Sequence, residues 1–170
     1  MKSKYNIALL PQSKSNKFIQ LAQQFSDSAD QYLLGENSLP HITLYQFYTY
    51  ENEISDIWQH ISQQLHEPTL SIDLIQFSYS TYKNNLYWIL LLPNKTEILH
   101  KMHATVANTL QLPIKESFEP HLTLINTKNS SLMPEIIKLE ESYRPITDTF
   151  TLSLGKSDEM GQYTKVIYQK

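Results

Sequence analysis

The chain has 170 residues, of which 41% are hydrophobic and 18% charged, and this is enough for one compact domain with a sizeable core. The net charge of −3 and the single arginine, Arg144, argue against a protein that holds long nucleic acid by its phosphates. The lack of cysteine excludes disulfides, thiolate nucleophiles and Cys-ligated metals. The apolar runs are too short for a signal-peptide core or a membrane span, so we expect a soluble, cytoplasmic protein with no membrane contact.

The first half of the chain predicts alternating strands and helices. Residues 5–10 are apolar enough for a buried strand, which Pro11 ends. Apolar residues then recur every three or four positions, which predicts an amphipathic helix of about fifteen residues. A strand follows over residues 40–48, a second helix over 54–65 and another strand over 70–77.

The second half of the chain repeats this order. Residues 86–92 predict a strand rich in aromatic and aliphatic side chains, and Asn94 with Glu97 three positions later is typical of a capping box at a helix start. A further strand, a short helix over 134–141 and a hairpin within 150–168 complete the chain.

Two nearly identical pentapeptides mark the repeat. Pro-His-Ile-Thr-Leu at residues 40–44 returns as Pro-His-Leu-Thr-Leu at residues 120–124, and Pro11 corresponds to Pro93. A matched strand, proline, helix and pentapeptide indicates two equivalent units. We therefore predict an α+β fold of two pseudo-symmetric β-α-β lobes, with antiparallel sheets facing a central cleft and helices on the outside.

These lobes are expected to form one bilobal domain over residues 1–170. The first lobe would cover about 1–80 and the second about 81–170, with room for some exchange of strands between them. A chain that contains its own duplication is expected to be a monomer.

Each pentapeptide carries a histidine and a threonine two positions apart. Because side chains alternate along a strand, His41 and Thr43 share one face, as do His121 and Thr123, while their aliphatic neighbours pack in the core. One neutral and one protonated imidazole supply a general base and a general acid to a phosphodiester. The threonine hydroxyls donate to its non-bridging oxygens, and this chemistry requires no metal and no cofactor.

The paired His-x-Thr-Leu stretches, about eighty residues apart, resemble the two-histidine (2H) phosphoesterase superfamily. Within it they are most similar to the bacterial 2'-5' RNA ligases, also called RNA 2',3'-cyclic phosphodiesterases, and residues 6–11 resemble the first strand of that family. The resemblance implies a cleft between two lobes and hydrolysis of a 2',3'-cyclic phosphate to a monoester. It also implies a reversible 2'-5' ligation, which some members carry out.

Carried over, the resemblance makes His41, Thr43, His121 and Thr123 the catalytic set. By analogy His121 activates water and His41 serves the leaving oxygen, although these roles can exchange with the direction of the reaction. The family often has an arginine after the second motif, where this chain offers only Lys128. The low basic content favours a nucleotide or a short RNA with a cyclic phosphate as the partner.

Three further residues are expected to bind substrate. Phe47 shares the parity of the first histidine and threonine and is placed on the cleft wall, Tyr45 is a candidate for base stacking, and Lys128 for the phosphate. An alternative function is a phosphate- or RNA-binding module of the same fold with little turnover. The spacing of His100 and His103 is compatible with zinc, but no further ligand lies near in sequence, so we expect them on a solvated helix face and predict no metal site.

Overall fold

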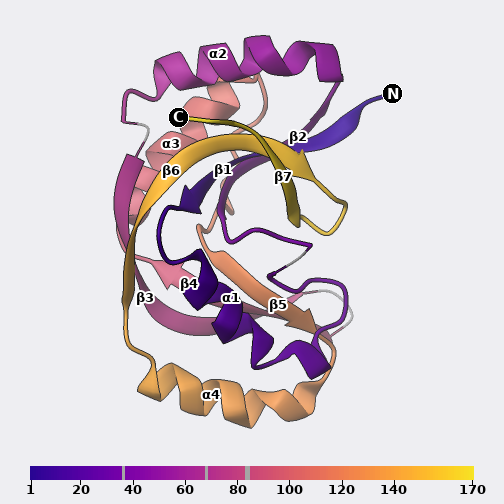
Figure 1. Ribbon diagram of the computed structural model, residues 1–170, viewed down its shortest axis with the longest axis vertical. Coiled ribbons are helices and arrows are strands. Elements are labelled where there is room, and N and C mark those ends of the chain that lie inside the picture. The colour runs from indigo at the N-terminus through magenta and orange to yellow at the C-terminus, as the bar shows by residue number, and fades with distance from the viewer. Residues whose placement is uncertain (36, 68, 83–84) are drawn as a thin grey trace.

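The computed structural model describes residues 1–35, 37–67, 69–82 and 85–170, which fold into the two lobes seen in Figure 1. The strands are β1 (Ser3–Pro11), β2 (Ile42–Thr49), β3 (Thr69–Tyr82), β4 (Leu86–Pro93), β5 (Leu122–Thr127), β6 (Ile146–Ser157) and β7 (Tyr163–Gln169). The α-helices are α1 (Ser15–Gln23), α2 (Ile54–Gln64), α3 (Thr96–Thr109) and α4 (Met133–Ser142). The predicted α+β class with antiparallel strands is confirmed.

Six of the strands close into a ring. The hydrogen-bonded order is β1, β2, β5, β4, β3 and β6, and β6 pairs with β1 in turn. The long β6 belongs to both lobes, because its first half pairs with β3 and its second half with β1 and β7. The link between β2 and β5 consists of a single residue pair, Ile42 with Leu122. Pairing therefore crosses the expected boundary near residue 80: β3 joins the sheet of β4 and β5, whereas the end of β6 joins that of β1 and β2.

The strand registers reveal a pseudo-twofold axis between the lobes. Ile42 and Leu122, which pair with each other, occupy the same place in the two pentapeptides. A β-bulge after Ile7 in the β1–β2 pair recurs after Ile89 in the β4–β5 pair, at the corresponding position of the repeat. The axis consequently passes between Ile42 and Leu122, and the two strands that carry the histidines meet on it.

This bulge decides which side chains of β2 face the cleft. Thr43 pairs with Ala8 of β1 and Tyr45 pairs with the preceding residue, Ile7. Leu44 between them has no partner and is the extra residue. An extra residue reverses the alternation beyond it. Gln46 therefore follows Thr43 on the cleft face, while Tyr45 and Phe47 are buried in the core. The expected placement of Phe47 on the cleft wall is wrong for this reason, and Tyr45 is likewise no part of that wall.

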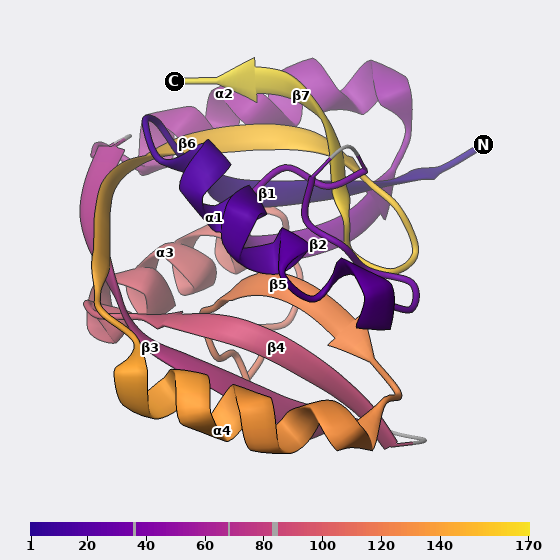
Figure 2. The same ribbon diagram turned by 60° about the horizontal axis from the view of Figure 1, so that its bottom comes forward.

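The helices lie outside the sheets, as Figure 2 shows. The α3 helix packs on β2 and α2 packs on α3, while α4 covers β3 and α1 lies against β5. The first helix is shorter than expected. The backbone N–H of Phe25 donates a hydrogen bond to the carbonyl of Ala22, which tightens the end of the helix, and a 3-10 turn, Ser26–Ser28, follows. Within the described residues, no helix is long and apolar enough to span a membrane.

The expected capping box at the start of α3 is wrong. Lys95, at the N-cap position, has a φ of 55° and makes no side-chain capping bond. The side chain of Asn94 turns instead to β3, where its Oδ1 accepts from the backbone N–H of Asp73 at 3.0 Å and its Nδ2 donates to the Asp73 carboxylate at 2.5 Å. Asn94 thus ties the end of β4 to β3.

Asp148 in β6 performs the corresponding task in the first lobe. Its carboxylate is almost fully buried and accepts from the backbone N–H groups of Ser13, Lys14 and Thr149 at 2.7–3.0 Å, and from the Ser13 hydroxyl at 2.6 Å. Burial raises its pKa, but these hydrogen bonds outweigh burial and leave the pKa below its ordinary value. The carboxylate therefore holds the turn between β1 and α1 onto the sheet.

Replacing this carboxylate by an amide tests the tie. Asp148→Asn keeps the shape of the side chain but replaces one accepting oxygen by an NH2 group, which then faces other hydrogen-bond donors. We therefore expect a loss of about 1–3 kcal/mol in the free energy of unfolding at pH 7. Since the pKa is lowered, this contribution is present above about pH 4 and is lost as the pH falls further. Chemical denaturation measures both effects, with the exposed Asp27→Asn as matched control; equal stability of the two variants would contradict the assignment.

Candidate active site

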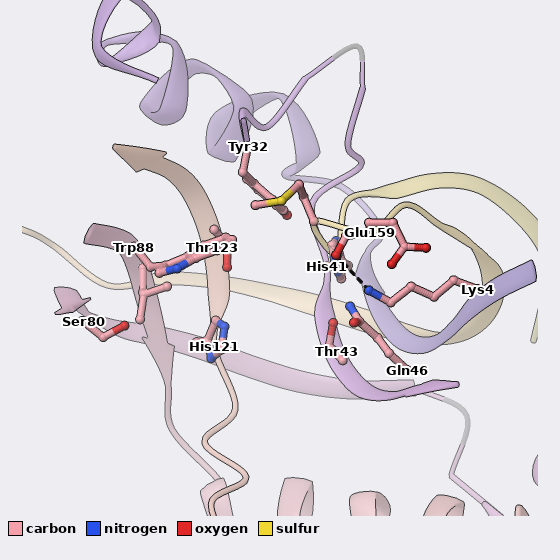
Figure 3. A pocket seen from close by; sticks show the side chains of 13 residues that line it. Lys4, Tyr32, His41, Thr43, Gln46, Ser80, Trp88, His121, Thr123 and Glu159 are labelled. Atoms are coloured by element: carbon pink, nitrogen blue, oxygen red, sulfur yellow. Dashed lines mark hydrogen bonds between the residues drawn. The ribbon is translucent and has the colours of Figure 1, made fainter. Parts of the chain in front are cut away.

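A cavity of about 330 Å³ opens where the two lobes meet, and both His-Thr pairs line it (Figure 3). His41 and Thr43 reach it from β2 and the residue before it, and His121 and Thr123 do the same from β5. The alternation of side chains along a strand, which predicted that each histidine shares a face with its threonine, holds up to the bulges that follow Thr43 and Thr123. The structure thus brings the predicted catalytic set into a single cleft.

Both imidazoles are held in the same tautomer. The Nδ1 of His41 lies 2.7 Å from the carbonyl oxygen of Leu39, and the Nδ1 of His121 lies 2.7 Å from that of Glu119. A carbonyl oxygen can only accept, so Nδ1 carries the proton and donates in each case. The Nε2 atom of each ring is left as the group that takes or gives a proton.

Antiparallel pairing sets the two histidines diagonally across the cleft. Because Ile42 pairs with Leu122, the register places His41 opposite Thr123 and His121 opposite Thr43. Figure 3 shows this arrangement, with one pair on each side of the cavity. A phosphate between them meets an imidazole and a hydroxyl from either side.

Thr43 has a hydrogen-bond partner that its counterpart does not share. Asn6, fully buried in β1, donates from Nδ2 to the Thr43 Oγ1 at 3.0 Å. The hydroxyl oxygen then acts as acceptor, which leaves its proton to donate to a ligand. The position of Asn6 in the repeat is taken by Trp88 in β4, so the two halves of the site differ next to the threonines.

Burial lowers the pKa of both histidines. For His41, which is 5% exposed, burial is the largest cause and the nearby His121 adds to it. Hydrogen bonds to the backbone of Leu39 and Gly161 oppose both, and the net effect lowers the pKa to about 4. Burial is also the main reason that the pKa of His121 is lowered. Both imidazoles are therefore neutral at pH 7, and an anionic phosphate between them favours the uptake of a proton.

The charges at the rim of the cavity balance. Lys4 and Glu159 are the lining side chains that carry a formal charge, and the Lys4 Nζ donates to the backbone carbonyl of Glu159 at 3.1 Å. The Glu159 carboxylate accepts from the Tyr48 hydroxyl at 2.6 Å. A site without excess positive charge suits a substrate that carries few phosphates.

Two aromatic residues of the cavity escape sequence reasoning. Trp88 lies within the continuous apolar run of β4, where no alternation reveals the side that faces the cleft. Tyr32 comes from the irregular segment before β2, and its backbone N–H donates to the Oδ1 of buried Asn126 at 2.9 Å. The two rings meet edge to face with centroids 5.7 Å apart. Trp88 thus offers a partly exposed aromatic surface to the cavity, and the buried Tyr32 packs against it.

Lys128 lies outside this cavity. Its side chain is exposed, and its backbone N–H donates to the Asp30 carboxylate at 2.5 Å beyond the end of β5. The lysine that lines the cavity is instead Lys4, on the opposite lobe, where sequence order gave no indication of it.

His103 is not on a solvated face, contrary to expectation. It is 2% exposed and lies between the rings of Tyr45 and Phe118, with centroid distances of 5.3 and 4.1 Å. Its Nδ1 donates to the carbonyl of Leu44 at 2.7 Å, and its Nε2 accepts from the backbone N–H of Lys115 at 3.1 Å. Both ring nitrogens are thus engaged. Across residues 1–35, 37–67, 69–82 and 85–170, no three His, Asp or Glu side chains gather to hold a metal ion.

A family model described as the 2'-5' RNA ligase superfamily matches residues 11–151. The chain belongs to this superfamily. Membership in the 2'-5' RNA ligase superfamily, whose members are two-histidine phosphoesterases, supports a phosphodiesterase in general terms.

Solved structures of E. coli LigT share the fold. LigT complexed with ATP has a TM-score of 0.65 at 11% identity, covering 100% of this chain and 98% of that one. LigT in apo form has a TM-score of 0.64 at 10% identity, and LigT complexed with 3'-AMP one of 0.62 at 12%; each covers 99% of this chain and 96% of LigT. Among curated proteins no relative matches the chain.

The lowered pKa of His41 predicts a stability that depends on pH. The unfolded chain takes up this proton below about pH 6.5 and the folded protein only near pH 4, so stability falls as the pH drops between these values. From pH 7 to pH 5 the His41 share of this loss is about 2 kcal/mol, at about 1.36 kcal/mol for each pKa unit. Chemical denaturation at the two pH values measures it.

His41→Gln removes that share and should flatten the dependence, whereas His60→Gln on the exposed face of α2 serves as control. An unchanged slope in His41→Gln would show that the imidazole is not held neutral by burial.

Proposed function

We propose that this protein is a metal-independent phosphodiesterase that hydrolyses 2',3'-cyclic phosphates of nucleotides or RNA ends to monoesters. The observation that carries this proposal is the pair of imidazoles related by the pseudo-twofold axis, each held at Nδ1 by a backbone carbonyl and both lining one shared cavity. Attacking and leaving oxygens lie on opposite sides of phosphorus in an in-line displacement. Each of them then has its own proton-transfer group.

The reaction needs one neutral and one protonated imidazole. The neutral ring takes a proton from water as the water oxygen bonds to phosphorus, and the protonated ring gives a proton to the ribose oxygen whose bond to phosphorus breaks. Thr43 and Thr123 donate to the non-bridging oxygens, where negative charge accumulates in the transition state. The substrate anion raises the pKa of the rings and so recruits the proton that the free protein lacks at pH 7.

The fold-sharing LigT structures that contain 3'-AMP or ATP support a nucleotide as the ligand class. The balanced charge of the rim supports a small substrate rather than a tRNA-sized one. A ligation, in which a 5'-hydroxyl replaces water as the nucleophile on the cyclic phosphate and a 2'-5' linkage forms, would use the same four side chains.

Single substitutions test the proton-transfer pair. His41→Ala and His121→Ala should each lower kcat/KM for a 2',3'-cyclic nucleotide by about 10²–10⁴-fold, since each removes an acid or base. Thr43→Val and Thr123→Val each remove one donor to the transition state, with an expected loss of about 10²-fold. The exposed His100→Ala is the matched control, and EDTA should leave the wild-type rate unchanged.

Full turnover by either histidine variant would overturn the proposed acid–base pair. Tight calorimetric binding of 2'- and 3'-nucleotides without any turnover of cyclic substrates would favour the alternative, a binding module of the same fold.

The pH profile provides an independent test. The productive free protein has one proton shared between two rings whose pKa values are both lowered, so kcat/KM should peak on the acid side of pH 6.5. The bound anion raises these pKa values, and the profile of kcat should therefore lie at higher pH than that of kcat/KM. Steady-state rates between pH 4 and pH 9 measure both profiles; a kcat/KM maximum above pH 7.5 would contradict the assignment.

A further inference from the structure

Asn6 is a buried amide that lies beside the catalytic cleft without lining it. It is fully buried in β1, where it pairs with Gln46 of β2 and with Gly155 of β6. Alternation along β1 places its side chain on the same face as Lys4, which lines the cavity. Figure 3 shows Lys4, Gln46 and Thr43 along one side of that cavity. Asn6 therefore lies behind the side chains that a ligand would meet.

The side-chain hydrogen bond of Asn6 goes to a member of the predicted catalytic set. Its Nδ2 donates to the Thr43 Oγ1 at 3.0 Å. Its Oδ1 is buried and has no hydrogen-bond partner among the residues that the structure describes. A buried polar atom without a partner destabilises a protein, and such atoms are rare in folded proteins. The amide is thus unfavourable for the stability of the core, and its contact with Thr43 is what it contributes.

The direction of this hydrogen bond decides what the Thr43 hydroxyl can do. A hydroxyl has one proton and two acceptor positions, and the Asn6 Nδ2 occupies one of the acceptor positions. The proton of the hydroxyl remains available for another acceptor. Because Thr43 lines the cavity, an oxygen of a bound phosphoryl group is such an acceptor.

The second lobe forms the same strand pair without an amide. Trp88 in β4 occupies the place of Asn6, and the bulge and the register of the β4–β5 pair match those of the β1–β2 pair. In this lobe the described residues show no counterpart of the hydrogen bond from Asn6 to Thr43. Strand pairing therefore does not require an amide at this position, and Asn6 serves something other than the sheet.

Building on the phosphodiesterase function above, we propose that Asn6 is a positioning residue, which directs the proton of the Thr43 hydroxyl at a non-bridging oxygen of the phosphoryl group. Negative charge grows on these oxygens in the transition state, and a donor that is already oriented needs no reorganisation at that moment. Thr43 is then a fixed donor, whereas the Thr123 hydroxyl rotates to meet the ligand. Asn6 touches neither the substrate nor the reacting atoms and acts through Thr43.

Removal of the amide tests this role. Asn6→Leu keeps the branched shape of the side chain and removes the N–H donor. We expect kcat for a 2',3'-cyclic nucleotide to fall about tenfold with little change in KM, because the Thr43 hydroxyl remains but is no longer directed. The matched control, Asn16→Leu on the exposed side of α1, should leave both unchanged. An unchanged kcat in Asn6→Leu would overturn the proposal. A higher kcat would also overturn it, since the Asn6 Oδ1 would then be the atom that accepts the Thr43 proton.

A double-mutant cycle shows whether Asn6 acts through Thr43. In Thr43→Val the addition of Asn6→Leu should cause no further loss of kcat, since no hydroxyl is left to orient. In Thr123→Val the same addition should lower kcat by the factor seen in the wild type. A full further loss in the Thr43→Val background would contradict the assignment.

Stability separates positioning from a structural role. Because Asn6→Leu removes a buried amide with an unsatisfied oxygen, the free energy of unfolding should stay the same or rise while kcat falls. Chemical denaturation measures it. If Asn6→Leu does not fold, Asn6→Ala takes its place in the cycle. Failure of both variants to fold would show that the amide serves the fold, and the proposal would be wrong.

Binding separates this inference from the proposed function. The complex of adenosine with vanadate imitates five-coordinate phosphorus, and 2'-AMP represents the ground state. Asn6→Leu should weaken binding of the vanadate complex about tenfold and change that of 2'-AMP by less than about twofold, and neither effect should appear in Thr43→Val. This pattern without turnover of any cyclic phosphate would overturn the phosphodiesterase and leave the role of Asn6 supported. Turnover without coupling between Asn6 and Thr43 would overturn the role of Asn6 alone, and absence of both would overturn both.

Discussion

The architecture depends on one antiparallel contact, the pairing of Ile42 with Leu122 on the pseudo-twofold axis. It is the only residue pair that joins β2 to β5 in the described chain, and it directly follows the two histidines. Because the paired residues are equivalent in the repeat, whatever one strand presents to the cleft the other presents from the opposite side. The contact thus brings the two His-Thr pairs of a duplicated sequence to either side of one cavity.

The duplication is retained in the backbone and relaxed in the side chains. Registers and bulges correspond between the lobes. The side chains beside the two threonines do not. Asn6 in one lobe directs a hydroxyl, and Trp88 in the other offers a flat apolar surface. The two lobes therefore share a backbone frame and differ in the side chains beside the His-Thr pairs.

Sequence reasoning predicted that the two His-Thr pairs line one cleft because a strand has a period of two and because the same pentapeptide occurs twice. It failed on Tyr45 and Phe47, since a single inserted residue, Leu44, reverses the alternation just beyond Thr43. Bulges leave little trace in a sequence that has no glycine at the position. Trp88 was hidden by the uniform hydrophobicity of β4, and Tyr32 is placed by a long-range bond to Asn126 that no local pattern encodes.

The same limit explains the remaining errors. The side chain of Asn94 was assigned to the helix beside it in sequence but bonds to Asp73 on a neighbouring strand. His103 was expected on a solvated face, although it lies four residues after Leu99 and three before Val106, on the buried side of α3; the segment around Lys115 and Phe118 folds back over it. In each case a contact between distant parts of the chain overrides a local preference that is worth only about 1 kcal/mol.

The ring of six strands determines how the two lobes are joined. Since β6 runs continuously from one lobe into the other and Ile42 pairs with Leu122, the lobes share two backbone connections. The spacing between the two His-Thr pairs is therefore set by sheet hydrogen bonds around the whole ring and not by a linker.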